Sequence, residues 1–194
     1  MKAVDMLRAE LLAPLDGTDR AKWLRTKSAR LAGFARAKWV FRGCEAGERL
    51  CALGLVKVEN RGRVVFGDRV TFVGGMIPSS IEAHEGGVLN IGSDTSINYG
   101  TRFEVHQSIE VGRGCLFASM IFLCDKMGSK VAPIRIGDDC WIAHGAVIEP
   151  GVTIGRGSVV AAGALVTKDV PEDSLALGNP ARTMKLSTVD QNPR

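Results

Sequence analysis

A six-residue repeat runs through the C-terminal half of the chain. From Ile136 onward the sequence divides into IGDDCW, IAHGAV, IEPGVT, IGRGSV, VAAGAL and VTKDVP, and each block opens with Ile or Val. Two further pairs of blocks begin at Val111 and Phe117, and at Ile91 and Ile97. A period of six differs from the 3.6-residue period of a helix and contains the two-residue period of a strand three times. A short period that is kept over many blocks is typical of a solenoid.

Each block has the composition of a short strand followed by a turn. The leading aliphatic residue points inward, and the fifth position, which is Cys, Ala, Val or Ser, leaves room for the backbone to turn. Successive coils then stack at about 4.8 Å and bury their aliphatic side chains against one another. Residues 50–82 continue the pattern less regularly. We therefore predict an all-β solenoid domain over residues 50–182, a helical segment over 1–45 and a C-terminal tail over 183–194.

The segment from Arg20 to Arg42 has an uneven charge. It contains eight basic residues and no acidic one, and apolar residues such as Trp23, Phe34 and Trp39 lie between them. One interpretation is a helix that packs its apolar side on the rest of the protein. The other is a basic amphipathic segment, residues 20–42, that contacts an anionic membrane surface. Nucleic acid is not expected as a partner, since the net charge is only +4 and no binding motif is present.

The cysteine pattern and the N-terminus point to the cytoplasm. There are five cysteines, an odd number, and no two form a Cys-x-x-Cys pair. This favours free thiols in a reducing compartment over a disulfide frame or a zinc knuckle. Asp5 and Glu10 interrupt the place where a signal peptide would need an apolar run, and no stretch is long enough to span a membrane. We expect a cytoplasmic protein, peripheral to the inner face of the membrane if residues 20–42 bind there.

Two motifs in the segment from Pro133 to Arg182 are more specific than the repeat itself. They are Pro-Ile-x-Ile-Gly followed by Trp-Ile at 141–142, and Gly-Asn-Pro-Ala-Arg at 178–182. With them, roughly residues 60–185 resemble the hexapeptide-repeat O-acetyltransferases that act on galactosides, maltose, polysaccharides and lipopolysaccharides. The resemblance implies a left-handed parallel β-helix that assembles as a cyclic homotrimer. It also implies transfer of an acyl group, usually acetyl from acetyl-CoA, to a sugar or glycan acceptor.

The resemblance also places the cofactor and the acceptor. Acyl-CoA is expected in a groove between the solenoid walls of two subunits, and small or cationic side chains there suit the pantetheine arm and the phosphates. The positions that match the CoA site are Trp141, His144, Ala162, Thr167, Lys168, Arg182 and Lys185. On the acceptor side we expect Asn98, His84 and Glu104.

The usual general base is missing from its expected place. Enzymes of this family use a histidine, often in a loop just after an Asp, to remove the proton of the acceptor hydroxyl. The corresponding loop here, residues 124–133, contains no histidine. Lys126 or Met127 stands where the base is expected, after Asp125. A lysine is normally protonated and needs strong desolvation to act as a base.

Two of the three histidines belong to an internal repeat. Ile81-Glu82-Ala83-His84 matches Phe103-Glu104-Val105-His106, 22 residues later, which is about one coil. We therefore expect His84 and His106 to stack in one column about 5 Å apart. A third copy is expected to place Cys124 in that column, 18 residues after His106, with Glu149 extending it.

These patterns lead to a ranked set of catalytic residues. We predict that His106 replaces the loop histidine or binds the acceptor, and that Glu104 or Asp125 orients it. The alternative is that His84 and His106 are exposed wall residues without a role. His144 is the second candidate for the base. Cys124 is expected to be a buried or idle thiol, because nothing in the sequence lowers its pKa.

Four functions are compatible with the repeat. The first is O-acylation of a sugar or glycan precursor, and the second is N-acylation of an amino sugar, which needs a weaker base. The third is a binding scaffold that has lost the chemistry. The fourth, a γ-type carbonic anhydrase, needs three histidines around zinc, and gaps of 22 and 38 residues between the histidines do not provide them. No metal is therefore expected.

Overall fold

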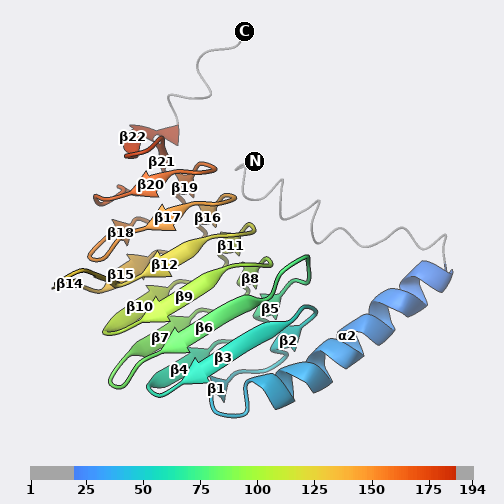
Figure 1. The fold of residues 1–194 in the computed structure, drawn as a ribbon. Coiled ribbons are helices and arrows are strands. Elements are labelled where there is room, and N and C mark those ends of the chain that lie inside the picture. The colour runs from blue at the N-terminus through green and yellow to red at the C-terminus, as the bar shows by residue number, and fades with distance from the viewer. Residues whose placement is uncertain (1–19, 187–194) are drawn as a thin grey trace, which may run out of the picture.

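The computed structural model describes residues 20–186 as one helix followed by a parallel β-solenoid (Figure 1). The helix, α2, spans Arg20–Val40. The strands wind into three stacked parallel sheets, which we call faces A, B and C, so that each coil visits the three faces in that order. The solenoid predicted from the repeat, the left-handed parallel β-helix that the resemblance implies, and the N-terminal helix are confirmed as the fold class.

Each face is built from strands that lie one coil apart. Face A contains β1 (Glu45–Ala46), β4 (Arg63–Phe66), β7 (Val88–Ile91), β10 (Ser108–Val111), β15 (Ile134–Ile136) and β18 (Thr153–Ile154). Face B contains β2 (Cys51–Ala52), β5 (Thr71–Phe72), β8 (Ser96–Ile97), β11 (Leu116–Phe117), β16 (Trp141–Ile142), β19 (Val159–Val160), β21 (Ser174–Leu177) and the antiparallel β22 (Arg182–Lys185). Face C contains β3 (Val56–Asn60), β6 (Ser79–Ala83), β9 (Arg102–Val105), β12 (Phe122–Cys124), β17 (Val147–Ile148) and β20 (Leu165–Val166).

One insertion interrupts the coils. After β12 the chain leaves the solenoid and forms an antiparallel hairpin of β13 (Lys126–Met127) and β14 (Lys130–Val131). It returns to face A at β15, which pairs with β10 as if the hairpin were absent. The hairpin is the loop in which the sequence lacks a histidine.

The leading residues of the repeat form the core. Those of the six consecutive blocks are all almost completely buried: Ile136, Ile142, Ile148, Ile154, Val160 and Val166. The buried residue of each strand lies directly over its counterpart in the next coil, as Ile142 does over Phe117. Burial of stacked aliphatic side chains contributes about 25 cal/mol for each Å² removed from water, so the leading residues of the repeat stabilise the solenoid.

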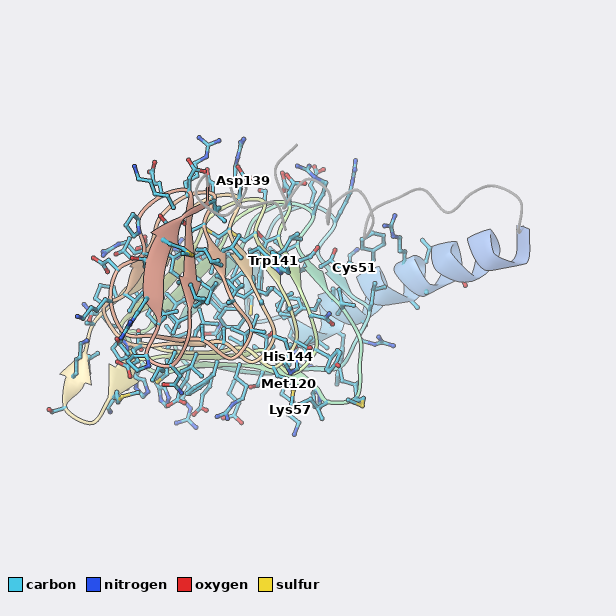
Figure 2. All side chains as sticks on the ribbon, turned by 90° about the horizontal axis from the view of Figure 1, so that it is seen from above. Cys51, Lys57, Met120, Asp139, Trp141 and His144 are labelled. Carbon is cyan, nitrogen blue, oxygen red and sulfur yellow. The ribbon has the colours of Figure 1, made fainter. Side chains whose placement is uncertain are left out.

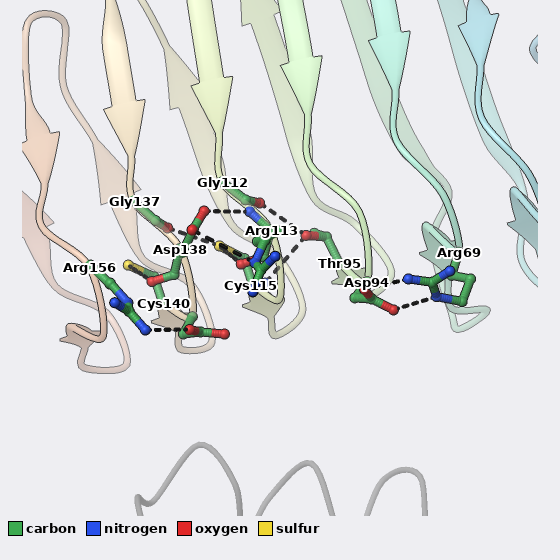
Figure 3. A network of polar contacts seen from close by, with 11 residues as sticks. Arg69, Asp94, Thr95, Gly112, Arg113, Cys115, Gly137, Asp138, Cys140 and Arg156 are labelled. Atoms are coloured by element: carbon green, nitrogen blue, oxygen red, sulfur yellow. Dashed lines mark hydrogen bonds and ion pairs between the residues drawn. The ribbon is translucent and has the colours of Figure 1, made fainter.

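Small polar side chains close the corner between faces A and B (Figure 3). The Thr95 hydroxyl donates to the carbonyl of Gly112, and the Cys115 thiol donates to the carbonyl of Gly137, each over 3.2 Å. The Cys140 thiol repeats the contact on the following coil. All five cysteines are free, as the sequence predicted. The cysteines in this ladder satisfy backbone carbonyls of the turn.

The helix packs on the N-terminal end of the solenoid. Gly33, Ala37 and Phe41 form a buried stripe at four-residue spacing, and the Phe41 ring lies 4.9 Å from that of Phe66. A Cβ on Gly33 would lie 2.7 Å from the Cys51 sulfur, so a larger residue there would force the Cys51 side chain or the helix to shift. The packing interpretation of this segment therefore holds from residue 28 onward, where side chains are described. Within residues 20–186, no helix is long and apolar enough to cross a bilayer.

Candidate functional site

The three histidines lie on two different edges of the solenoid. The His144 edge, where face B turns into face C, carries Asn98, Ser119, His144 and Ala162. The His106 edge, where face C turns into face A, carries His84, His106 and Asp125. Seen along the solenoid axis, His144 and Met120 lie together at one corner, while the β13–β14 hairpin projects from another (Figure 2). A single chain therefore does not bring His106 and His144 into one site.

On the His144 edge, a serine holds the histidine ring. The Ser119 Oγ lies 2.8 Å from His144 Nδ1. Ser119 is buried and His144 is exposed. Within residues 20–186, the other ring nitrogen, Nε2, has no hydrogen-bond partner. If the serine oxygen accepts the Nδ1 proton, the lone pair on Nε2 is left pointing to solvent and can accept a proton.

The neighbours of His144 on this edge are a small residue on one side and apolar residues on the other. Ala162 lies on the next coil, and the backbone N–H of Gly163 donates to the carbonyl of His144 over 2.8 Å. In the opposite direction lie Met120 and Ile77, which pack over Gly100 and remain partly exposed. His144 thus separates an open backbone surface from an apolar shelf.

On the His106 edge, two imidazole rings stack. The register pairs Ile81 with Phe103 and Glu82 with Glu104, which places His84 over His106. The ring centroids are 3.9 Å apart and the planes are 11° from parallel. The predicted stacking of His84 and His106 on adjacent coils is confirmed.

Glutamates accompany both rings. Glu104 Oε1 lies 3.2 Å from His106 Nε2, and Glu82 Oε1 lies 3.4 Å from His84 Nε2. Of the two residues suggested to orient His106, Glu104 contacts the ring. Asp125 instead accepts the backbone N–H groups of His106 and Gln107, each over 2.7 Å, and is fully buried. Its carboxylate fixes the backbone of the edge.

The prediction that Cys124 continues the histidine column was wrong. Leu123 pairs with Phe103 and Cys124 pairs with Glu104, so this coil has 20 residues and not 18. The four-residue strands β9 and β10 make it longer than three hexapeptides. The residue that corresponds to His106 is Lys126, where the chain leaves the coil for the hairpin.

Glu149 lies in the same column as Cys124. Because Ile148 pairs with Leu123, Glu149 follows the column of Cys124 and Glu104, and its predicted place in the histidine column was also wrong. The Cys124 thiol is buried and donates to the carbonyl of Lys126 over 2.9 Å. Burial raises the pKa of this thiol, which keeps it protonated near neutral pH.

The residues expected to hold CoA are distributed over both edges and face B. His144 and Ala162 lie on the His144 edge, whereas Thr167 and Lys168 follow β20 on the side of the His106 edge. Trp141 lies on face B, and Arg182 and Lys185 lie exposed on β22. A groove of about 500 Å³ on face A contains none of these residues.

A family model for the bacterial transferase hexapeptide (six repeats) matches residues 133–168. The match covers the blocks whose leading residues form the core. Residues 133–168 therefore carry the hexapeptide repeat of that family. A Schizosaccharomyces pombe protein, provisionally named an acetyltransferase, is 55% identical to this hexapeptide-repeat protein over 53 residues. That segment is 27% of this chain and only 26% of the relative's length.

Solved structures match a larger part of the hexapeptide-repeat protein. The polySia specific acetyltransferase NeuO is 26% identical, with a TM-score of 0.60, and the match covers 73% of this chain and 80% of that one. The perosamine N-acetyltransferase from Caulobacter crescentus, solved as a point mutant with CoA and GDP-perosamine, is also 26% identical, with a TM-score of 0.55. That match covers 94% of this chain and 74% of the other.

Sequence reasoning did not find Ser119 as the partner of His144. The two residues are 25 positions apart, a distance that includes the hairpin. Because the hairpin length is not part of the repeat, spacing alone did not indicate that they lie on adjacent coils. The phase of the blocks beginning at Phe117 and Ile142 was the available signal, since Ser119 and His144 each follow the leading residue by two.

Proposed function

We propose that this hexapeptide-repeat protein transfers acetyl from acetyl-CoA to a hydroxyl of a sugar or glycan precursor, with His144 as general base. The observation that carries the proposal is the Ser119–His144 pair on the edge that also carries Ala162. Similarity to two acetyltransferases, one of them solved with CoA, supports acetyl-CoA as the donor.

The chemistry follows from the ring geometry. With Nδ1–H donated to Ser119, His144 Nε2 accepts the proton of the acceptor hydroxyl while that oxygen attacks the thioester carbonyl. The new C–O bond forms, the C–S bond breaks, and the protonated imidazole returns the proton to the CoA sulfur. Ser119 is a positioning residue, because it fixes the tautomer without contacting the reacting atoms.

A complete site in this proposal needs two subunits. The predicted CoA residues lie on two edges that face different directions in one chain, and a cyclic homotrimer would place one edge beside the other edge of a neighbour. Lys168, Arg182 and Lys185 are exposed and can neutralise the phosphates of CoA. On the acceptor side we propose Asn98, together with the apolar shelf of Met120 and Ile77.

His106 and Lys126 remain part of the proposal as residues of the acceptor side. His106 is the second candidate for the base, since Glu104 orients its ring. Lys126 is exposed at the start of the hairpin.

The outer surface of the helix supports a location at a membrane. Leu31 and Trp39 are each about 70% exposed there, and the Arg42 guanidinium lies 5.7 Å from the centroid of the Trp39 ring. Aromatic and basic side chains together suit an anionic interface. Cytoplasmic location and membrane contact through residues 20–42 are therefore kept as proposals.

Amino-sugar N-acylation is the second candidate function, favoured by the similarity to the perosamine N-acetyltransferase. The test is release of CoA thiol from acetyl-CoA with a panel of neutral sugars and amino sugars. We expect thiol release with a neutral sugar and its loss in His144→Ala. Release only with amino sugars would select the second candidate. No release with any acceptor, together with no binding of acetyl-CoA, would overturn both.

A further inference from the structure

The His106 edge brings two copies of a Glu-x-His sequence into register. Glu82 pairs with Glu104, and His84 stacks on His106. Two imidazoles and two carboxylates from adjacent coils thus gather on one patch of the surface. The proton transfer proposed for His144 and Ser119 uses none of these side chains, although His106 is also placed on the acceptor side.

The spacing of the donor atoms fits a shared ion. Ligand atoms of His84, Glu104 and His106 all lie within 4.8 Å of one another. The two nitrogen–oxygen separations, 3.2 Å for His106–Glu104 and 3.4 Å for His84–Glu82, are close to the roughly 3.3 Å that separates neighbouring ligands of a tetrahedral zinc ion. The remaining atoms are up to 4.8 Å apart, and the two rings are nearly parallel, so at least one imidazole has to turn out of the stack for both histidines to reach one ion.

One of the candidate ligand atoms lacks a hydrogen-bond partner. Nε2 of His84 is buried and makes no hydrogen bond, since its approach to Glu82 lacks the required geometry. Among the side chains that the structure describes, no other buried nitrogen or oxygen lacks a partner. A buried polar atom without a partner costs free energy, which a bound ion would recover.

The negative charges of neighbouring glutamates also favour a bound cation. Glu59, Glu82 and Glu104 occupy consecutive positions in one column of face C, because β3 pairs with β6 and β6 pairs with β9. Like charges directly opposite each other on neighbouring strands repel. A dication between Glu82 and Glu104 would neutralise two of the three carboxylates.

We propose that His84, His106 and Glu104, with Glu82 as a fourth ligand, bind one divalent first-row transition ion of the zinc type. Neutral imidazole and carboxylate are suitable ligands for such ions. The sequence analysis expected no metal because the histidine spacing does not fit a zinc site of three histidines. In the site proposed here, glutamates take the place of the third histidine. Coordination uses His106 Nε2, so a metal-bound His106 is not available as a base through that atom.

Titration with Co²⁺, followed by visible absorbance, and with Zn²⁺, followed by calorimetry, tests the site without any measurement of acetyl transfer. The full chain should bind one ion per chain. His84→Gln and His106→Gln should each weaken binding at least about tenfold, because loss of even an outer-shell partner of a metal ligand costs that much. His144→Gln, on the other edge, is the matched control and should keep wild-type affinity. Glu59→Gln, in the same column, removes a nearby negative charge but no ligand, so it should weaken binding less than either histidine variant does.

Two results would overturn the proposal. One is the absence of one-to-one binding in the wild-type chain. The other is a wild-type affinity for the ion in each of the single variants His84→Gln and His106→Gln, or a loss of binding in His144→Gln. If a histidine variant fails to fold by circular dichroism, Glu104→Gln removes a partly exposed carboxylate and asks the same question.

Discussion

The two histidine-bearing edges of the solenoid differ in what surrounds the ring. On the His144 edge a neutral hydroxyl holds an exposed imidazole, and one ring nitrogen faces solvent. On the His106 edge each imidazole lies beside a carboxylate and stacks on a second imidazole. The first arrangement leaves a nitrogen available to accept a proton, whereas the second gathers ligands. The partners of a histidine therefore indicate its role better than its position in the repeat does.

Removing the His144 ring is expected to have the largest effect on activity. His144→Ala should lower the rate of acetyl transfer about 10²–10⁴-fold, because a general base contributes that much. The loss should exceed that of His106→Ala by at least about tenfold. CoA thiol release at saturating acetyl-CoA measures both.

The control for this ranking is Glu110→Gln on face A, where the side chain is exposed and pairs with Arg135 over 3.6 Å. It should keep the wild-type rate. If His106→Ala lost more activity than His144→Ala, the roles assigned to the two edges would have to be exchanged.

A second test compares how the edges are held together. Asp125→Ala removes the buried carboxylate that accepts two backbone N–H groups of the His106 edge. Unfolding free energy should fall by about 2–4 kcal/mol, since hydrogen bonds to a charged group are lost and two donors are left unpaired. Urea denaturation measures this.

Gln107→Ala is the matched control for Asp125→Ala, because the Gln107 side chain is exposed and its backbone N–H is unchanged. It should alter stability by less than about 0.5 kcal/mol. A loss below about 1 kcal/mol in Asp125→Ala would mean that water can replace the carboxylate, and that the edge is not rigidly built.

The two edges also differ in how much of their structure could be predicted from the sequence. The leading Ile and Val residues determined the fold, because their burial depends only on the period of six. The stacking of His84 on His106 followed from the repeated Glu-x-His spacing. The misplacement of Cys124 arose where β9 and β10 exceed the length of a hexapeptide strand.

Contacts that depend on a ring's rotation or a loop's length were beyond prediction. Ser119 reaches His144 only because the chain returns to β15 in register after the hairpin. Asp125 points inward to the backbone and Glu104 outward to the ring, although both were equal candidates from spacing. Such choices are made by packing at the corner and not by the repeat.

The serine on the His144 edge is expected to have a moderate effect. Ser119→Ala should lower kcat about five- to tenfold, in keeping with loss of one hydrogen bond worth about 1 kcal/mol, and leave the KM for acetyl-CoA unchanged. Ser119→Thr, which keeps the hydroxyl, should recover part of the rate. An equal rise in KM would instead indicate that Ser119 shapes the CoA surface and does not position the base.

The smallest effect concerns the thiol beside the His106 edge. Because burial raises the pKa of Cys124, its thiolate is scarce at pH 7, and alkylation by iodoacetamide should be slower in the folded chain than in urea. The rate should grow about tenfold per pH unit and continue to rise above about pH 8.5, where an ordinary thiol levels off. Mass spectrometry of the Cys124 peptide measures this. Fast alkylation at pH 7 in the folded chain would reveal an activated thiolate, and the His106 edge would then hold a nucleophile.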